Sequence, residues 1–520
     1  MLPVLFIGAF RARTGMVRTH GEDYIQGAKA IGEVLMTVRA GLIILVSGFS
    51  LTVGGPRSLP AARPYSRVSE ESVDLGRRIF EHNWARPESW TGPEQLGDGG
   101  DGLGPMFNEV SCVACHHLGG TGGAGANNHN VNLLSVDLRP TDSELRRMQL
   151  LEQAHFIHPH FTASNGTVLL HEFGFGPRDD EWEYQRFRSG LISRQGSSRA
   201  PGGARCFRMS DSAVPFELAQ RNTPPLWGLG LIELIRRDNG ERTRLRLAKQ
   251  QRRSRHGVSG RIPLTMDGEF GWYGWRGHVS DLQQFVVNAC ANELGLEVPQ
   301  QVQPENPLYS RLSRTRAKVL DLTENQVTAL TAYLAKLPRP VQVLPDDPFE
   351  MESVELGEGH FQRIGCTECH PAKLASVDGV FSDLLLHDMG QLTSDRSTAV
   401  PARMPARTET RQTGGYSGAS VTVRIPPQEL PSNTDQEWRT PPLWGVSDSP
   451  PYYHDGRAAT IHEAILLHDG EAAFSASAYR SMPYSHRQQL LSFLGTLRGP
   501  GAKEHDKSSS GESADSVAVN

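Results

Sequence analysis

Cys112-Val-Ala-Cys115-His116 and Cys366-Thr-Glu-Cys369-His370 are two copies of one short pattern, Cys-x-x-Cys-His, and they use four of the six cysteines in the chain. The pattern sets two thiols about one helical turn apart and places an imidazole directly after the second. Thiols at this spacing add across the vinyl groups of a haem, and the histidine then coordinates the iron. We therefore predict two covalently bound c-type haems. Their attachment residues are Cys112, Cys115, Cys366 and Cys369, and their proximal iron ligands are His116 and His370.

Two other chemistries also use a Cys-x-x-Cys pair. A thioredoxin-type redox pair belongs in a β-α-β context, which the surrounding sequence does not show. A zinc site needs no histidine directly after the second cysteine, yet both copies have one. The repetition therefore favours haem. Zinc is the alternative that a colourless purified protein would support.

The two patterns belong to a longer internal repeat. Each follows an amphipathic stretch and is followed by the hexapeptide Thr-Pro-Pro-Leu-Trp-Gly and then by a helix with apolar residues at three- and four-residue spacing. We predict a mainly α fold of two cytochrome c-like domains from an internal duplication, with long loops and insertions. The stretches are Val73–Phe80, Thr223–Gly228 and Leu330–Leu337 in the first half, and Val354–Phe361, Thr440–Gly445 and Leu490–Leu497 in the second.

The domain boundaries follow from this repeat. Residues 1–66 form a leader, either a signal peptide or a membrane anchor, because residues 40–53 are an uncharged apolar run of signal-peptide size. Residues 67–340 form the first haem domain, with a basic, glutamine-rich insertion at Arg236–Arg261. Residues 346–499 form the second haem domain, and residues 500–520 a disordered, polar tail.

The composition is that of a globular protein of 520 residues, of which 38% are hydrophobic and 21% charged. A net charge of −5 shows no basic excess, which argues against a nucleic-acid partner. Six cysteines are too few for a fold built on disulfides. Cys206 and Cys290 lie outside the repeated pattern, and they either pair in an oxidising compartment or stay free thiols.

Several longer stretches resemble the bacterial di-haem cytochrome c peroxidase superfamily, in particular its peroxidase-like branch of di-haem oxidoreductases, also known as thiol oxidoreductases. The similarity extends from about residue 70 to residue 498. It is carried by Gly102–Asn108, Ser111–His116, Gly268–Trp272, Thr440–Gly445 and Tyr453–Ala458. The resemblance implies two mainly helical cytochrome c-like domains that face one another and pass electrons between their haems.

In the second half, the resemblance points to His468, which stands where the family's peroxidases place a methionine on iron. Together with His370 it would give bis-histidine iron, whose reduction potential is lower than with methionine. The alternative is that His468 caps the C-terminus of a helix, where a cation is favoured. His454 lies in a loop that shapes the pocket in this family, so we interpret it as a structural residue or a neighbour of a ligand.

The corresponding first-half stretch, Leu282–Cys290, contains no imidazole or thioether at the equivalent place. The first iron is then either five-coordinate or bound by a flexible ligand, and an open position is what peroxide chemistry requires. The candidate flexible ligand is His129, in the glycine- and asparagine-rich Gly119–Asn132, with His117 and His278 as weaker candidates.

One departure from the family concerns acid–base catalysis. The family's peroxidases have a glutamate over the peroxidatic haem, where this chain reads Gln283-Gln284. Glutamine cannot transfer a proton by titration. Either another group serves, with Glu269 and Glu293 near in sequence, or the protein is not an efficient peroxidase. The catalytic residues are therefore left unassigned.

These features predict a periplasmic or otherwise exported di-haem oxidoreductase. Its expected partners are a small electron-donor protein, of cytochrome c or cupredoxin type, and a small oxidant such as hydrogen peroxide. One alternative is an electron carrier without turnover, which leaves open whether the protein is an enzyme. Another is a modifier of a partner protein, which needs a tyrosine ligand from among Tyr452, Tyr453 and Tyr479. An inter-domain calcium ion, the oligomeric state and a coupling role for Trp272 and Trp275 are also left open.

Overall fold

The computed structural model describes the chain from residue 68 to residue 500 with gaps. The described ranges are 68–138, 142–162, 165–175, 181–193, 195–199, 207–209, 214–265, 267–309, 319–395, 403–404, 407–412, 420–425, 428–429 and 434–500. The predicted leader and the tail beyond residue 500 lie outside them, as does Cys206. All described residues belong to one compact unit, Ala62–Asn520. None of the helices in these ranges has the length and apolar character that crossing a membrane needs.

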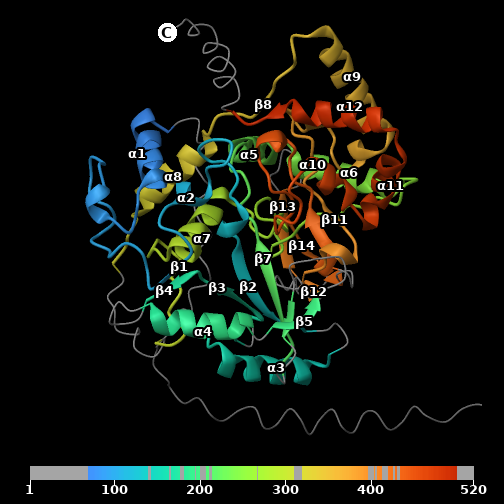
Figure 1. Ribbon diagram of the computed structural model, residues 1–520. Helices are drawn as coiled ribbons and strands as arrows, with labels where there is room; N and C mark the ends of the chain where they lie inside the picture. Colours follow the sequence, from blue (N-terminus) through green and yellow to red (C-terminus); the bar gives the residue numbers. More distant parts are fainter. Residues whose placement is uncertain are drawn as a thin grey trace, which may run out of the picture. The chain divides into compact units, whose positions relative to one another are not determined.

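Twelve α-helices are present in the described ranges (Figure 1). They are α1 (Glu70–Glu81), α2 (Cys112–Cys115), α3 (Glu144–Ile157), α4 (Trp182–Ser193), α5 (Leu229–Arg237), α6 (Gly240–Gln251), α7 (Leu282–Leu294), α8 (Glu324–Ala335), α9 (Pro348–Arg363), α10 (Ile461–Leu466), α11 (Ala473–Ser481) and α12 (Tyr484–Gly495). The predicted stretches Val73–Phe80 and Val354–Phe361 lie within α1 and α9. The other two are helical as predicted but extend two residues past the ends of α8 and α12.

These four helices form two close pairs, α1 with α8 and α9 with α12. A glycine makes each contact close, because a side chain there would strike the partner helix. A Cβ on Gly76 of α1 would lie 2.1 Å from the carbonyl oxygen of Ala329 in α8. A Cβ on Gly357 of α9 would lie 2.0 Å from the carbonyl oxygen of Gln489 in α12. The same kind of helix contact therefore occurs next to both Cys-x-x-Cys-His patterns.

A five-stranded antiparallel sheet lies within the first half, in the order β3-β2-β7-β6-β5. Its strands are β3 (Thr167–Leu170), β2 (Val131–Val136), β7 (Phe216–Arg221), β6 (Phe207–Met209) and β5 (Gln195–Arg199). Leu134 and Leu218 on neighbouring strands pack with Leu151 of α3 and Leu191 of α4 in a separate core (Figure 1). The predicted fold contained no sheet, so the mainly α prediction is confirmed only in part.

Two-stranded antiparallel pairs complete the described strands. They are β1 (Met106–Phe107) with β4 (Phe173–Gly174), β8 (Val341–Gln342) with β17 (Leu497–Arg498), β9 (Lys373–Leu374) with β10 (Val377–Asp378), β11 (Leu386–Asp388) with β16 (Glu437–Arg439), β12 (Arg403–Met404) with β15 (Gln428–Glu429), and β13 (Arg407–Gln412) with β14 (Ser420–Ile425). The pair β8 and β17 joins the predicted linker between the halves to the end of the second half.

The two Thr-Pro-Pro-Leu-Trp-Gly loops meet each other. Gly228, the last residue of the first loop, has a positive φ of 82°, and a Cβ on it would lie 2.4 Å from the ring of Trp444 in the second loop. Gly445, with a φ of 72°, faces Trp227 in the same way, with a Cβ 3.0 Å from that ring. The glycine of each loop thus packs against the indole ring of the other loop. Both indoles belong to the largest core cluster, which unites the two halves.

Candidate haem-binding sites

The first Cys-x-x-Cys-His pattern forms a single helical turn, α2. Ser111 begins it, because its hydroxyl accepts a hydrogen bond of 3.2 Å from the amide of Ala114. The amide of His116 donates to the carbonyl of Cys112 at 3.0 Å, which closes the turn. The turn keeps both cysteines on one short element and sends the imidazole out directly after it. Each of the three side chains is partly accessible, so a planar group can reach them.

The ring of His116 is neutral and oriented by the backbone. Its Nδ1 lies 3.2 Å from the carbonyl oxygen of Gly123. Burial lowers the pKa of His116 to about 4, so the ring carries one proton, which Nδ1 donates to that carbonyl. A second backbone group, the carbonyl of Pro224, also hydrogen-bonds the ring of His116. A metal-binding histidine is held in this way by a hydrogen bond through its other nitrogen.

The second pattern repeats this geometry. A 3-10 turn, Cys366–Glu368, carries the first cysteine, and the amide of His370 donates to the carbonyl of Cys366 at 2.9 Å. Nδ1 of His370 lies 2.8 Å from the carbonyl oxygen of Phe381. Burial again lowers the pKa of this histidine to about 4. The ring therefore also donates through Nδ1 and leaves Nε2 available.

Both histidines contact an equivalent aromatic ring and an equivalent loop. The ring centroids of Phe80 and His116 are 6.4 Å apart, and those of Phe361 and His370 are also 6.4 Å apart. Nδ1 of each histidine bonds one backbone carbonyl, and the residue just before that carbonyl is held by a Thr-Pro-Pro-Leu-Trp-Gly loop. The leucine amide of the loop donates to its carbonyl, at 2.7 Å in the first half and 3.2 Å in the second. The donors are Leu226 and Leu443, and the acceptors are Gly122 and Val380.

His468 lies near His370, close enough to influence its pKa. It follows α10, and its Nδ1 lies 2.8 Å from the carbonyl oxygen of Ala464 and 3.2 Å from the hydroxyl of Tyr453. Burial lowers the pKa of His468, so the ring is neutral and the cationic cap is disfavoured. After burial, the proximity of His468 is a further reason why the pKa of His370 is low. The ligand assignment stays a prediction, and this geometry is compatible with it.

The first half has no imidazole at the position of His468. Thr460 is the N-cap of α10, and Asp281 is the N-cap of α7. His468 is the eighth residue after Thr460, and the eighth residue after Asp281 is Ala289, which is exposed. The two loops before these caps also match, because the bridges Tyr273–Val279 and Tyr452–Ala458 span the same number of residues.

The three weaker ligand candidates of the first half are placed as follows. Nδ1 of His129 lies 2.9 Å from a carboxylate oxygen of Glu109, and its ring centroid lies 5.9 Å from that of the exposed His117. His278 lies beside three arginines, and desolvation followed by these cations lowers its pKa to about 4. Their role as iron ligands stays a prediction.

Glu293 is the carboxylate that the fold brings to the first site. One of its oxygens accepts a hydrogen bond of 2.6 Å from the side-chain amide of Asn108. Burial raises the pKa of Glu293. The carboxylate is near Cys115: after burial, Glu293 is the largest cause of the raised pKa of that thiol, followed by Glu109. Glu269, the other candidate, is exposed.

The family comparison concerns the second half. A family model described as "di-haem oxidoreductase, putative peroxidase" matches residues 428–497. The resemblance to the di-haem oxidoreductases is confirmed. The matched segment contains three of the features discussed above, Thr440–Gly445, Tyr453–Ala458 and His468, but neither Cys-x-x-Cys-His pattern.

Two solved structures show weak likeness to the chain. Hydrazine synthase of Kuenenia stuttgartiensis, studied under xenon pressure, is 18% identical, with 54% of this chain and 72% of that chain covered and a TM-score of 0.29. A MauG-like protein associated with microbial copper homeostasis is 15% identical, with 46% and 79% covered and a TM-score of 0.25. TM-scores this low carry no argument about this chain. No curated protein matches the sequence.

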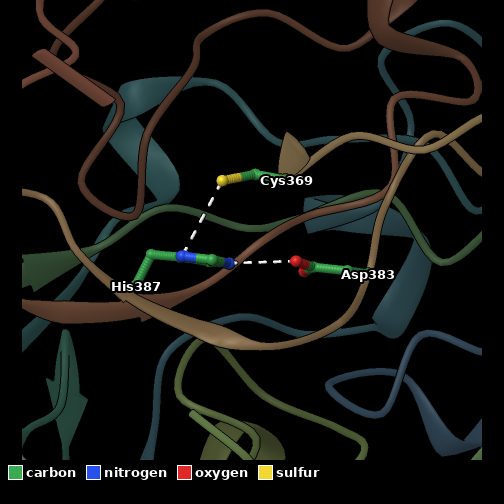
Figure 2. A group of neighbouring side chains, drawn as sticks. All are labelled: Cys369, Asp383 and His387. Carbon is green, nitrogen blue, oxygen red and sulfur yellow. Dashed lines mark hydrogen bonds and ion pairs between the residues drawn. The ribbon is translucent and has the colours of Figure 1, made fainter. Parts of the chain in front are cut away.

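A buried ionic cluster lies beside the second Cys-x-x-Cys-His site (Figure 2). His387 Nδ1 is 3.7 Å from the sulfur of Cys369, and His387 Nε2 is 3.0 Å from a carboxylate oxygen of Asp383. A carboxylate oxygen of Glu471 lies 2.7 Å from the same Nδ1. Burial alone would lower the pKa of His387, but the adjacent Asp383 raises it well above its ordinary value. The sequence analysis missed this cluster.

The cluster also bears on the zinc alternative. Ligand atoms of Cys369, Asp383 and His387 lie within 4.8 Å of one another, so these residues could hold a metal ion. Within the described ranges no such group exists at the first Cys-x-x-Cys-His pattern. Zinc would therefore account for one copy of the pattern, whereas haem accounts for both. The donor sets fit haem, because each supplies two thiols and an imidazole that is oriented through Nδ1 by a backbone carbonyl.

The structure also places His454 and Cys290. His454 is buried and stacks on Trp438, with ring centroids 3.6 Å apart. The backbone carbonyl of His454 accepts a hydrogen bond of 2.7 Å from the amide of Asn222 in the first half, which fits a structural role. Cys290 is a free, buried thiol, whereas its suggested partner Cys206 lies outside the described residues.

Proposed function

We propose that this chain is an exported di-haem c-type oxidoreductase that reduces hydrogen peroxide with electrons from a small donor protein. The observation that carries the proposal is the matched geometry of its two Cys-x-x-Cys-His sites. In each, a neutral histidine donates through Nδ1 to a backbone carbonyl. We also infer that the two halves arose by duplication, since their helix pairs, aromatic contacts and loops correspond.

The attachment residues follow from the pattern. Cys112 and Cys115 hold one haem through thioether bonds, with His116 as its iron ligand. The pair Cys366 and Cys369 acts in the same way, with His370. Bound haem supplies one-electron redox chemistry and an iron that can bind a small oxidant.

The two sites differ in function because they differ in the residue that stands opposite the proximal histidine. At the second site, Nδ1 of His468 is held by Ala464, which directs its Nε2 as a second ligand. At the first site the equivalent residue is Ala289, which offers no ligand atom. The first site is therefore the one at which a small oxidant binds, and the second is suited to electron entry.

Glu293 supplies the proton at the first site in place of the missing glutamate. Reduction of one peroxide to two waters consumes two electrons and two protons, so a proton donor is needed where the O–O bond breaks. Burial raises the pKa of Glu293, which favours its protonated form, and Asn108 orients the group through a hydrogen bond. Gln284 instead donates to Asn288 at 2.8 Å and cannot take this role.

The two Thr-Pro-Pro-Leu-Trp-Gly loops connect the sites. Each loop is hydrogen-bonded to the segment that orients one proximal histidine, and the loops contact each other through Trp227 and Trp444. This packing gives a continuous path of bonded and touching groups along which an electron passes from the second site to the first.

The first experiment is a pyridine haemochrome assay with intact mass on exported protein, which should give two c-type haems per chain. The second is to add peroxide to the reduced protein, which should oxidise it rapidly. Two low-spin, six-coordinate haems that ignore peroxide and cyanide in every redox state would instead indicate the electron carrier without turnover. A colourless protein with zinc on its cysteines would remove the proposal entirely.

A further inference from the structure

One face of α6 and the loop after it form a strongly basic surface. We name this set the α6 basic face: Arg242, Arg246, Lys249, Arg252, Arg253 and Arg255. All six side chains are exposed, and none forms an ion pair within the described residues. Arg242, Arg246, Lys249 and Arg253 follow helical spacing, so they form one stripe. In a chain of net charge −5, such a concentration of positive charge is local.

The opposite face of α6 is fixed in the protein. Arg244, Ala248 and Gln251 are buried. The guanidinium of Arg244 lies 4.2 Å from the ring centroid of Trp272 and donates to the carbonyl of Gly271 at 3.1 Å. Because these contacts fix the rotation of the helix, the basic stripe has a defined direction. At its centre, Leu245 keeps 51% of its surface exposed.

The loop after α6 is attached to the second Cys-x-x-Cys-His pattern. Glu368, which lies between the two cysteines, is its anchor. The side-chain amide of Gln251 donates to the carbonyl of Glu368 at 2.7 Å, and the hydroxyl of Ser254 donates to its carboxylate at 2.5 Å. Nδ1 of His256 also contacts the same carboxylate, and its ring stacks on Phe474 of α11, with centroids 3.8 Å apart.

The exposed arginines therefore alternate with the residues that hold this pattern. Arg252 and Arg253 stand between Gln251 and Ser254, and Arg255 stands between Ser254 and His256. Positive charge is thus placed along the segment where the second haem is attached. A partner protein that binds to this surface would lie next to that haem.

We propose that the α6 basic face docks a small acidic redox protein that delivers electrons to the haem held by Cys366 and Cys369. The inference rests on the proposed function and specifies the charge of the partner and the surface on which it docks. In each encounter one electron leaves the reduced partner and enters the haem, with no bond or proton exchanged. Opposite charges steer such partners together and can raise association rates by about 10- to 1,000-fold. Leu245 supplies the apolar centre that such interfaces have inside a polar rim.

The test uses the mature di-haem protein and a double charge reversal, Arg246→Glu with Arg253→Glu. Reduction of the second haem by a reduced acidic cupredoxin is followed by stopped-flow absorbance at low ionic strength. The rate constant should fall about tenfold, and the difference from the wild type should shrink as salt screens the charges. Arg146→Glu, a single charge reversal at an exposed position of α3, should leave the rate unchanged.

Three controls separate the outcomes. Reduction by ascorbate and the haem spectra should be the same in all variants, which shows that the site is intact. Peroxide turnover driven by ascorbate tests the proposed function independently of docking. The docking proposal fails if the acidic cupredoxin does not reduce the wild type, if the double variant reacts as fast, or if a basic cytochrome c is the faster donor. It also fails if the variant loses only binding to phosphatidylglycerol vesicles, because the face is then a membrane contact.

Discussion

Replacing Gly357 by alanine tests how closely α9 and α12 approach beside the second haem site. The new Cβ would lie 2.0 Å from the carbonyl oxygen of Gln489 and 3.0 Å from the Cβ of Phe493. The first of these is backbone and cannot turn aside, so the helices must separate. Overpacking of this kind costs about 3 kcal/mol at its upper range, and alanine returns about 1 kcal/mol of helix propensity. We expect the free energy of unfolding to fall by about 2 kcal/mol.

Gly359, two residues along the same helix, provides the matched control. A Cβ at this position meets nothing within 4 Å. Gly359→Ala should therefore raise the free energy of unfolding by up to about 1 kcal/mol. Guanidinium denaturation of the di-haem protein, followed by far-UV circular dichroism and by Soret absorbance, measures both variants. If Gly357→Ala is as stable as the wild type, or if the two variants change stability alike, the close helix contact is wrong.

Three more predictions concern the histidines and Glu293. His468→Ala should convert one haem from low to high spin and raise its potential, whereas an unchanged spectrum would remove His468 as a ligand. Glu293→Gln should slow peroxide reduction by about 10²–10⁴-fold. In the wild type the rate should decline as the pH rises through the raised pKa of Glu293. A wild-type pH profile without this decline would contradict the role of Glu293 as an acid. His158 and His171 each have a pKa lowered to about 3 by burial, so the unfolded chain binds more protons below about pH 6.5 and stability should drop as the pH falls from there. His171→Gln should weaken that dependence in denaturation curves at pH 7.5 and 5, and an unaltered slope would show that this histidine is not responsible.

Local patterns predicted four of the described helices and the two Cys-x-x-Cys-His sites, whose role in haem attachment stays a prediction. Cys-x-x-Cys-His is a contiguous signal, and the apolar spacing of α1, α8, α9 and α12 is a property of each segment alone. The sheet was not predicted, because its strands are short and come from distant stretches such as β2 and β7. Their pairing is decided by the core beneath them rather than by their own residues.

The surroundings of the two sites depended on tertiary contacts. Glu293 was only one of two carboxylates in the neighbourhood, and its approach to Cys115 follows from the path of α7. His387 gave no signal, because a histidine four residues after Asp383 is an ordinary pattern. Its importance appears only when Glu471, 84 residues away, closes the same cluster.

Because the two Thr-Pro-Pro-Leu-Trp-Gly loops pack against each other, each half alone would expose an apolar surface that the other half covers. A chain divided between residues 340 and 346 would leave Trp227 on one fragment and Trp444 on the other, each without the glycine it rests on. Such fragments should be insoluble apart and should recover only when produced together. For the same reason, a side chain larger than hydrogen at Gly228 or Gly445 could be accommodated only if the facing ring of Trp444 or Trp227 moved or became smaller.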